Sequence, residues 1–347
     1  MKFSDKVDFL KDPSSYPGTT NKVRVRETHT AMVFLTDERV YKMKKPVRFA
    51  YLDATRLDSR EHLCREEYRL NSQLSANTYL GVTPLRLDND GRFALNGSGK
   101  IVDWLVVMER LPEAQFLSNR ITGNDVSRTE ITELAAYLSD FYRRQRRNPV
   151  LTPIYANHLI RESRVNEQHL TAMRAELNCS SIDAVLKASH TQLHKNMPEI
   201  KDRICEGLIV EGHGDLRPEH VCLVSPPVLF DRLEFDPNML AIDIYDEVNY
   251  LGLECRQAGA EWIGPLLLHL VEERIGDAPS PGLLETYSVF RLLLRARLAI
   301  DHLLDPNPEK PKMWIEQSLS YVRAATAVLR LDGKTAKLSI PISDNSR

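Results

Sequence analysis

Residues 211–236 read EGHGDLRPEHVCLVSPPVLFDRLEFD, and they carry an unusual density of His, Asp, Arg and Glu. Two short apolar runs, 221–224 and 228–230, predict a hairpin of strands. Asp215 stands just before the first run and Asp231 just after the second. Pairing of the two runs would therefore bring both carboxylates into one cleft.

Two carboxylates held close together repel each other unless a cation or a proton is shared between them. One use of such a pair is phosphoryl transfer, in which one carboxylate holds magnesium and the other accepts a hydroxyl proton. Aspartate is also common in loops at strand ends. From spacing alone, the interpretation of Asp215 and Asp231 as two unrelated loop residues therefore stays open.

Composition limits the class of protein. The chain has 347 residues, which is enough for two lobes, and its 42% hydrophobic content is ordinary for a globular protein. The formal net charge of −2 gives no reason to expect a nucleic-acid or membrane partner. The five cysteines are far apart and form no CxxC pair, so reduced buried thiols are expected rather than a zinc site or disulfides.

The sequence also bears on cellular location. Its start has no apolar core of the kind found in signal peptides. No run approaches the roughly 20 apolar residues that span a bilayer. We therefore expect a cytoplasmic protein.

The first third of the chain predicts strands with one helix between them. A turn at 36–39 joins the apolar run 31–35 to a strand on which Lys42 and Lys44 share one face. The pattern over 58–75 predicts a helix, with Asp58 or Ser59 as its cap. Residues 96–100, NGSGK, end like a P-loop, but Ile101 follows the lysine and Ala94 takes the place of the first glycine, so we expect a turn there.

Beyond about residue 113 the pattern becomes helical. Helices are expected over 129–144, 160–177 and 182–197, and then mostly helix to about 331, with a break at 305–314. This order predicts an α+β protein of two lobes. The expected divisions are a loose segment at 1–20, an N-lobe at 21–112, a helical C-lobe at 113–332 and a flexible tail at 333–347.

Several motifs in a fixed order carry a resemblance. HGDLRPEH, VLFDRLEFD and AIDIYDEV resemble the aminoglycoside phosphotransferase-type branch of the protein-kinase-like fold. ETHTAMVFLTDERVYKMKKPV, CREEYRLNSQL and YLGVTPL are similar to an uncharacterised bacterial group of kinase-like proteins, sometimes fused to a P-loop kinase domain. The resemblance spans roughly residues 20–300 and implies a protein-kinase-like two-lobed fold with ATP between the lobes.

The resemblance implies roles for individual residues. Asp215 matches the catalytic base, and Asp231 matches the aspartate that holds the metal. Lys42 matches the lysine that binds the donor phosphates, and Glu67 matches its glutamate partner, with Glu66 as the alternative. The remaining matches are Met108 beside the adenine site, Glu109 to Leu111 for adenine recognition by backbone, His213 and Gly214 for the shape of the catalytic loop, and Asp243 and Asp246 as supports of this loop or neighbours of the acceptor.

The sequence departs from that family at three places. His220 stands where the family has a metal-binding asparagine, and imidazole suits transition ions better than magnesium. Three alternatives stay open: His220 is a weaker ligand, it leaves the metal to Asp231 and water, or it marks a lost activity. The neighbouring Glu219 is a candidate substitute ligand. Arg217 stands where the branch usually has histidine, and it could stabilise the charge that develops in phosphoryl transfer. The phosphate loop has no glycine, which leaves Thr28 and Thr30 as its candidate phosphate ligands.

Each match has a simpler structural interpretation. Lys42 could be a solvated strand lysine, as Lys44 could be, and Glu67 could face water. Met108 could be a core residue, and His213 a buried histidine bonded to backbone. If all of these interpretations held, unrelated structural residues would match the family's catalytic residues in the same order along the chain.

The sequence therefore predicts an ATP-dependent phosphotransferase that uses Mg²⁺, with Mn²⁺ as the alternative ion, and phosphorylates the hydroxyl of a small molecule. Acids of the helical lobe could attract a cationic or polyhydroxyl acceptor: Asp246, Glu247, Glu254 and Glu261. One rival is a degenerate kinase that binds nucleotide or works through partners. A second rival keeps the fold and transfers the nucleotide instead of the phosphoryl group.

Overall fold

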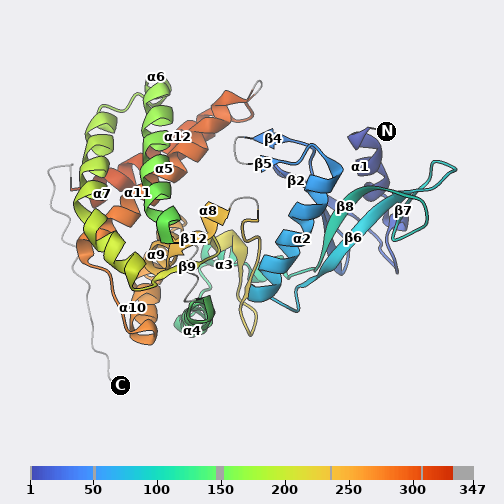
Figure 1. Ribbon diagram of the computed structural model, residues 1–347, viewed down its shortest axis with the longest axis horizontal. Coiled ribbons are helices and arrows are strands. Elements are labelled where there is room, and N and C mark those ends of the chain that lie inside the picture. Colours follow the sequence, from blue (N-terminus) through green and yellow to red (C-terminus); the bar gives the residue numbers. More distant parts are fainter. Residues whose placement is uncertain (1, 50–51, 146–151, 235–236, 306–307, 331–347) are drawn as a thin grey trace.

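The computed structural model describes residues 2–49, 52–145, 152–234, 237–305 and 308–330. One lobe is built on an antiparallel sheet, and the other is mostly helical (Figure 1). This mixed α+β architecture confirms the predicted fold class. The expected tail at 333–347 lies outside the described residues.

The sheet lobe contains β1 (Arg24–Glu27), β2 (Ala31–Leu35), β3 (Arg39–Lys44), β6 (Tyr79–Leu87), β7 (Phe93–Leu95) and β8 (Lys100–Glu109), with a small pair β4 (Arg48–Phe49) and β5 (Leu52–Asp53) and the helices α1 (Phe3–Lys11) and α2 (Leu57–Leu74). The six-stranded sheet has the order β1-β2-β3-β8-β6-β7, and all its pairs are antiparallel. The predicted β2–β3 hairpin is confirmed, because Thr36 and Arg39 close its turn by backbone hydrogen bonding.

The first residues of the chain differ from the prediction. Instead of a loose segment, α1 packs its Val7 and Leu10 into the core of the sheet lobe. Lys6 Nζ donates to Val102 O and to Asp103 Oδ2, both at 2.7 Å. A buried ion pair and apolar contacts therefore hold this helix on β8, information that the polar composition of the segment does not carry.

Helix α2 covers one face of the sheet. Its Cys64 packs with Trp104 and Val106 of β8. The predicted cap was wrong: Arg56 is the N-cap residue and makes no side-chain capping bond, while Asp58 instead pairs with Arg56. The amphipathic spacing that predicted the helix itself is confirmed, since Leu63, Leu70 and Leu74 are buried together with Glu67.

The helical lobe contains α3 (Leu117–Thr122), α4 (Arg128–Gln145), α5 (Thr152–Ala172), α6 (Arg174–Leu177), α7 (Ile182–Cys205), α8 (Pro237–Leu240), α9 (Ile244–Gln257), α10 (Ile263–Ile275), α11 (Pro281–Ile300) and α12 (Pro311–Val328). Helix α7 runs past the predicted end at 197, and the stretch predicted over 160–177 is divided between α5 and α6. Helices α9 and α10 approach closely where Gly252 meets Gly264, because a Cβ on Gly252 would lie 2.6 Å from the Gly264 backbone.

Short strands interrupt these helices and carry the opening motif. β9 (Ile209–Glu211) pairs with β12 (Ala241–Asp243), and β10 (Val221–Cys222) pairs with β11 (Val228–Leu229). The second pair confirms the predicted hairpin. Asp215 lies in the connection that leads into β10, and Asp231 lies two residues after β11, so the hairpin brings both ends of the motif to one place.

Two further findings concern the whole described chain. Within those ranges, no helix has the length and apolar character required to cross a membrane. All five cysteines are free thiols, and three of them, Cys64, Cys222 and Cys255, are buried.

Candidate functional site

The two lobes meet at a salt bridge between Lys42 and Asp231. Lys42 Nζ, on β3, lies 2.5 Å from Asp231 Oδ1, which follows β11. The Lys42 side chain is 11% exposed and that of Asp231 is 44% exposed, so this pair borders solvent. Burial opposes the charge of Asp231, but Lys42 and His220 outweigh it and hold the pKa of Asp231 well below its usual range.

Asp231 has a backbone conformation that few side chains adopt. Its φ is +63°, in the left-handed region where aspartate is one of the better tolerated residues. The Tyr79 hydroxyl accepts a hydrogen bond from its N–H at 3.0 Å. This contact from the start of β6 holds the backbone of Asp231, while its carboxylate pairs with Lys42.

Glu67 binds Lys42 from the opposite side. Its Oε1 lies 2.9 Å from Lys42 Nζ, and the residue is fully buried in α2. Glu66 points elsewhere and pairs with Arg69 in an exposed bridge. Of the two glutamates weighed from the sequence, Glu67 is therefore the partner of Lys42. Burial disfavours its charge, but Lys42 and Lys44 lower the pKa of Glu67 below its ordinary value.

Asp215 lies in the connection between β9 and β10, and two side chains hold one of its oxygens. Asp215 Oδ1 lies 2.9 Å from Arg217 Nε and accepts a hydrogen bond from the Tyr250 hydroxyl at 3.2 Å. Burial raises the pKa of Asp215, but Arg217 and His220 outweigh it and lower the pKa to about 2. Asp215 is therefore ionised at neutral pH.

His220 lies between the two aspartates. Its Nδ1 is 2.8 Å from the Asp215 carbonyl oxygen, which can only accept, so Nδ1 carries a proton. Its Nε2 lies 3.7 Å from Asp231 Oδ2. One amine from the sheet lobe and two acids from the helical lobe are thus joined through His220 around a single place.

His213 is a buried residue in the connection between β9 and β10. Its Nε2 lies 2.9 Å from the Phe230 carbonyl oxygen, and it is 1% exposed. Burial, together with His220, lowers the pKa of His213 to about 3, so the ring is neutral near neutral pH. This arrangement fits the interpretation of His213 as a buried histidine bonded to the backbone.

The next residue, Gly214, has φ +85°, and a Cβ there would lie 3.0 Å from the Met239 carbonyl oxygen. Its N–H donates to Glu247 Oε1 at 2.6 Å, and the His213 N–H donates to Glu247 Oε2 at 2.9 Å. Glu247 therefore holds the shape of the loop that carries Asp215. The sequence did not single it out for this role.

The acids predicted near the acceptor have other contacts. Asp243 caps α9 and pairs with Arg203, while Asp246 pairs with Arg291 at 2.7 Å. Asp243, Asp246 and Glu247 are all fully buried. Buried and paired acids cannot attract a cationic acceptor, so that expectation was wrong for Asp246 and Glu247; Glu261 is exposed and lies 4.0 Å from Arg256.

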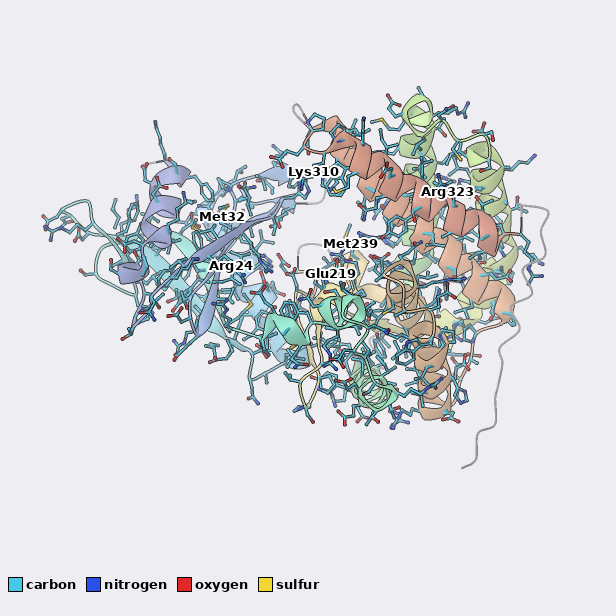
Figure 2. All side chains as sticks on the ribbon, turned by 180° about the vertical axis from the view of Figure 1, so that it is seen from behind. Arg24, Met32, Glu219, Met239, Lys310 and Arg323 are labelled. Atoms are coloured by element: carbon cyan, nitrogen blue, oxygen red, sulfur yellow. The ribbon has the colours of Figure 1, made fainter. Side chains whose placement is uncertain are left out.

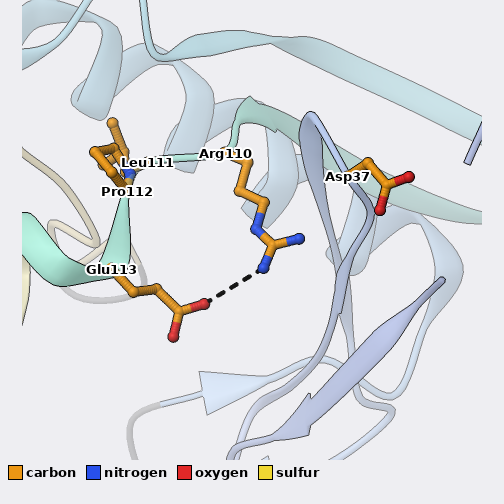
Figure 3. A pocket seen from close by; sticks show the side chains of 5 residues that line it. All are labelled: Asp37, Arg110, Leu111, Pro112 and Glu113. Atoms are coloured by element: carbon orange, nitrogen blue, oxygen red, sulfur yellow. Dashed lines mark ion pairs between the residues drawn. The ribbon is translucent and has the colours of Figure 1, made fainter. Parts of the chain in front are cut away.

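The connector between the lobes borders a pocket (Figure 3). Asp37, Arg110, Leu111, Pro112 and Glu113 line this pocket of about 290 Å³. The N–H groups of Glu109 and Arg110 donate to Thr78 O and Glu38 O. Within the described residues, the Leu111 N–H has no such partner.

Met108 belongs to the apolar cluster under α2, as its structural interpretation expects.

The predicted phosphate ligands lie in the turn between β1 and β2. The Thr28 hydroxyl is engaged within this turn, because it accepts a hydrogen bond from Ala31 N at 3.0 Å. The Thr30 carbonyl accepts from Lys45 N–H at 2.8 Å. The ring of His29, between them, lies 4.9 Å from the ring of His302 in the helical lobe, so the turn reaches across to that lobe.

The residues at Asp231 limit what metal the site could hold. Among the described residues, no group of three His, Cys, Asp or Glu side chains is arranged to hold a metal ion. Magnesium, however, is often held by one or two carboxylates together with substrate phosphates. Asp231 Oδ2 offers one oxygen of this kind, and His220 Nε2 lies 3.7 Å from it.

The charged cluster contains residues that sequence reasoning missed. Lys44 is buried between Glu67 and Glu234 rather than solvated, and Tyr250 contacts Asp215 from α9. The alternation that placed Lys44 on the face of Lys42 was a usable signal. Glu234 and Tyr250 carry no local signal. Figure 2 shows Glu219, the ion-pair partner of Arg217, on the part of the helical lobe that faces the sheet lobe.

Comparison with known sequences finds similar proteins in mycobacteria. The chain is 29% identical over 292 residues to uncharacterised proteins from Mycobacterium tuberculosis and Mycobacterium bovis. The match covers 83% of this chain and 56% of the relatives, so the chain spans about half their length. No protein-family profile matches the sequence.

Solved structures give a clearer similarity. A thermostable mutant of an aminoglycoside phosphotransferase superimposes with a TM-score of 0.55 at 13% identity, over 94% of this chain and 99% of that one. A choline kinase from Streptococcus pneumoniae gives 0.52 at 14% identity, over 94% and 100%. The same phosphotransferase in complex with AMP-PNP and hygromycin B gives 0.50 at 12% identity, over 93% and 99%. The chain therefore has the two-lobed, kinase-like fold of the aminoglycoside phosphotransferases and choline kinases.

Proposed function

We propose that the protein transfers the γ-phosphoryl group of ATP to the hydroxyl of a small molecule. The observation that supports this most directly is the convergence of Lys42, Asp231 and Asp215, linked through His220, where the two lobes meet. The fold is that of proteins named as small-molecule phosphotransferases, one of them in complex with AMP-PNP. Phosphoryl transfer relies on such positioning and charge neutralisation.

In this proposal Lys42 binds the donor phosphates while Glu67 keeps it oriented. In the structure Lys42 pairs with Asp231, so the phosphates of a bound nucleotide would replace that carboxylate at Nζ. Asp231, with His220, would then be free to hold Mg²⁺ or Mn²⁺, which when bound neutralises charge on the phosphates. The unpartnered N–H of Leu111 and the turn containing Thr28 and Thr30 are the corresponding candidates at the adenine and phosphate ends.

Asp215 would receive the acceptor hydroxyl. Its Oδ1 is held by Arg217 and Tyr250, which leaves Oδ2 for the hydroxyl proton. The acceptor oxygen forms a bond to the γ-phosphorus, the bond from phosphorus to the ADP oxygen breaks, and the hydroxyl proton passes to Asp215. With a pKa of about 2, Asp215 is a weak base, so it orients the hydroxyl and accepts the proton late, as expected for a loose transition state.

The experiment is a phosphorylation assay with γ-labelled ATP, Mg²⁺ or Mn²⁺ and a fractionated metabolite extract. We expect Asp215→Asn to lower the transfer rate by about 10²–10⁴-fold, the usual contribution of a positioned base. Asp90→Asn, in an exposed turn, is the control. Transfer that is equal in both variants would contradict the role of Asp215.

A degenerate kinase is the second candidate, and His220 in the asparagine position favours it. In that case AMP-PNP would bind and no acceptor would be labelled with either ion. Label from α-phosphate on an acceptor would instead indicate nucleotidyl transfer.

A further inference from the structure

A second buried lysine lies beside the first on β3. Lys44 follows Lys42 by two residues, so both side chains project from the same face of the strand. Lys44 Nζ contacts Glu67 Oε2 and Glu234 Oε1. The side chains of Lys44, Glu67 and Glu234 are 2%, 0% and 6% exposed, so water is nearly excluded from this second bridge.

The two lysines and three acids form a continuous chain of alternating charge. Its order is Asp231, Lys42, Glu67, Lys44, Glu234. Each carboxylate oxygen of Glu67 pairs with one of the two lysines. The two ends of the chain, Asp231 and Glu234, lie three residues apart in one segment, so the contacts close a ring through the backbone of 231–234.

This ring is costly as a stabilising device. A buried ion pair often stabilises a fold no better than apolar side chains of similar size would, because each charge loses its hydration. Here the acids also outnumber the lysines. The exposed end of the ring, Lys42 and Asp231, is the part placed at the candidate site. The arrangement is therefore better explained by a role at the candidate site than by a contribution to the stability of the fold.

Such a role is needed when Lys42 exchanges Asp231 for nucleotide phosphates. If nucleotide phosphates take Lys42, Glu67 must share that cation with them, and Asp231 must stay in place after its bond to Lys42 is lost. Lys44 meets the first need by neutralising the other oxygen of Glu67. It meets the second through Glu234, which holds the far end of the segment that carries Asp231.

We propose that Lys44 and Glu234 are positioning residues that keep Glu67 and Asp231 in place while Lys42 exchanges Asp231 for nucleotide phosphate. This role rests on the proposed phosphoryl transfer. Neither residue touches the reacting groups; both act through Glu67 and the 231–234 segment.

Removal of Lys44 would change how the site responds to pH. The charged or titratable side chains around Glu234 are Lys44 and Lys42 from β3 and Glu67 and Cys64 from α2. Burial raises the pKa of Glu234, and Lys44 is the largest opposing influence. Without Lys44 the pKa of Glu234 rises further, so its neutral form is favoured in the folded protein. The resulting stabilisation is present at low pH and is lost as the pH rises through the raised pKa.

The experiment compares Lys44→Met, Lys44→Arg and the double variant Lys44→Met/Glu234→Gln, with Lys100→Met on the exposed start of β8 as the control. The kcat and the KM for ATP are measured from about pH 5.5 to about pH 9, with the melting temperature followed in the same buffers. We expect the kcat/KM of Lys44→Met to fall by up to about tenfold per pH unit above the raised pKa of Glu234, because Glu234 then carries an unpaired charge. The double variant removes this pH dependence, and Lys44→Arg keeps the wild-type profile.

Two outcomes would overturn the proposal: a uniform loss in Lys44→Met at every pH, or no recovery of the flat profile in the double variant. If the wild type transfers no phosphoryl group, the proposed function fails and the same variants are compared by AMP-PNP affinity. A pH-dependent affinity in Lys44→Met that the double variant corrects would still support the positioning role. Affinities that do not depend on Lys44 would reject it.

Discussion

At the scale of single residues, His220 determines which atoms face Asp231. Its Nδ1 donates to the Asp215 carbonyl, which leaves Nε2, 3.7 Å from Asp231 Oδ2, as the ring atom available to an ion. An imidazole nitrogen at this place suits manganese better than magnesium, because magnesium prefers oxygen ligands. The residue thus biases the choice of ion in the proposed reaction.

We predict that His220→Asn shifts this choice toward Mg²⁺. The amide oxygen replaces a nitrogen, so the ratio of Mn²⁺-supported to Mg²⁺-supported kcat/KM should fall by about tenfold, within the usual range for altered metal surroundings. The ratio is measured in buffers that contain one ion at a time. His194→Asn, on an exposed part of α7, is the control. An unchanged ratio in His220→Asn would show that Nε2 does not bind the ion.

At the scale of elements, Arg232 connects α2 to β9, the strand that precedes Asp215. It is fully buried and donates to Gly212 O at 2.7 Å, to Leu70 O at 3.2 Å and to Glu211 O at 2.8 Å. The backbone N–H of Arg232 also donates to Asn71 Oδ1. One side chain thus satisfies carbonyl groups at the end of β9 and on α2, and so fixes the helix that carries Glu67.

Arg232→Met should lower the free energy of unfolding by about 3 kcal/mol, since each buried carbonyl that loses its donor costs about 1–3 kcal/mol. Urea unfolding measures this change. The matched control is Arg69→Met on α2, whose bridge to Glu66 is exposed and should be worth less than about 1 kcal/mol. Equal losses in the two variants would show that the buried contacts of Arg232 contribute nothing beyond an ordinary surface arginine.

At the scale of the whole molecule, the bridge between Lys42 and Asp231 joins the lobes across the candidate site. A ligand that binds only the folded protein stabilises it by about 2.7 kcal/mol when present at about a hundred times its Kd. If Asp231 holds the ion, part of the stabilisation by AMP-PNP should require metal. Chelation of the ion should then remove that part.

We predict that Asp231→Asn abolishes the metal-dependent part of the AMP-PNP thermal shift and leaves the metal-free part. Melting is followed with AMP-PNP in the presence of Mg²⁺, Mn²⁺ or EDTA. Asp140→Asn, on the exposed face of α4, should keep both parts. A metal-dependent shift that persists in Asp231→Asn would place the ion elsewhere.

Much of the candidate site could be predicted from local pattern. Strand alternation put Lys42 on a defined face, helix spacing favoured Glu67 over Glu66, and the hairpin carried Asp215 and Asp231 to the same end. Whether an acidic side chain is solvated or buried was harder to predict. Asp246 and Glu247 look like solvated helix residues, yet both are fully buried, where Arg291 pairs with Asp246 and the His213 N–H donates to Glu247.

The hairpins, the amphipathic helices and the order of the two lobes could be predicted from the chain alone, because they follow from periodicity and turn chemistry within a few consecutive residues. Which charges are buried, and with which partners, depends on tertiary contacts. Lys44 meets Glu234 across 190 residues of chain, and α1 meets Asp103 across 97. The state of a charged side chain depends on water exclusion and on opposite charges from distant segments, and neither is written in its neighbours along the chain.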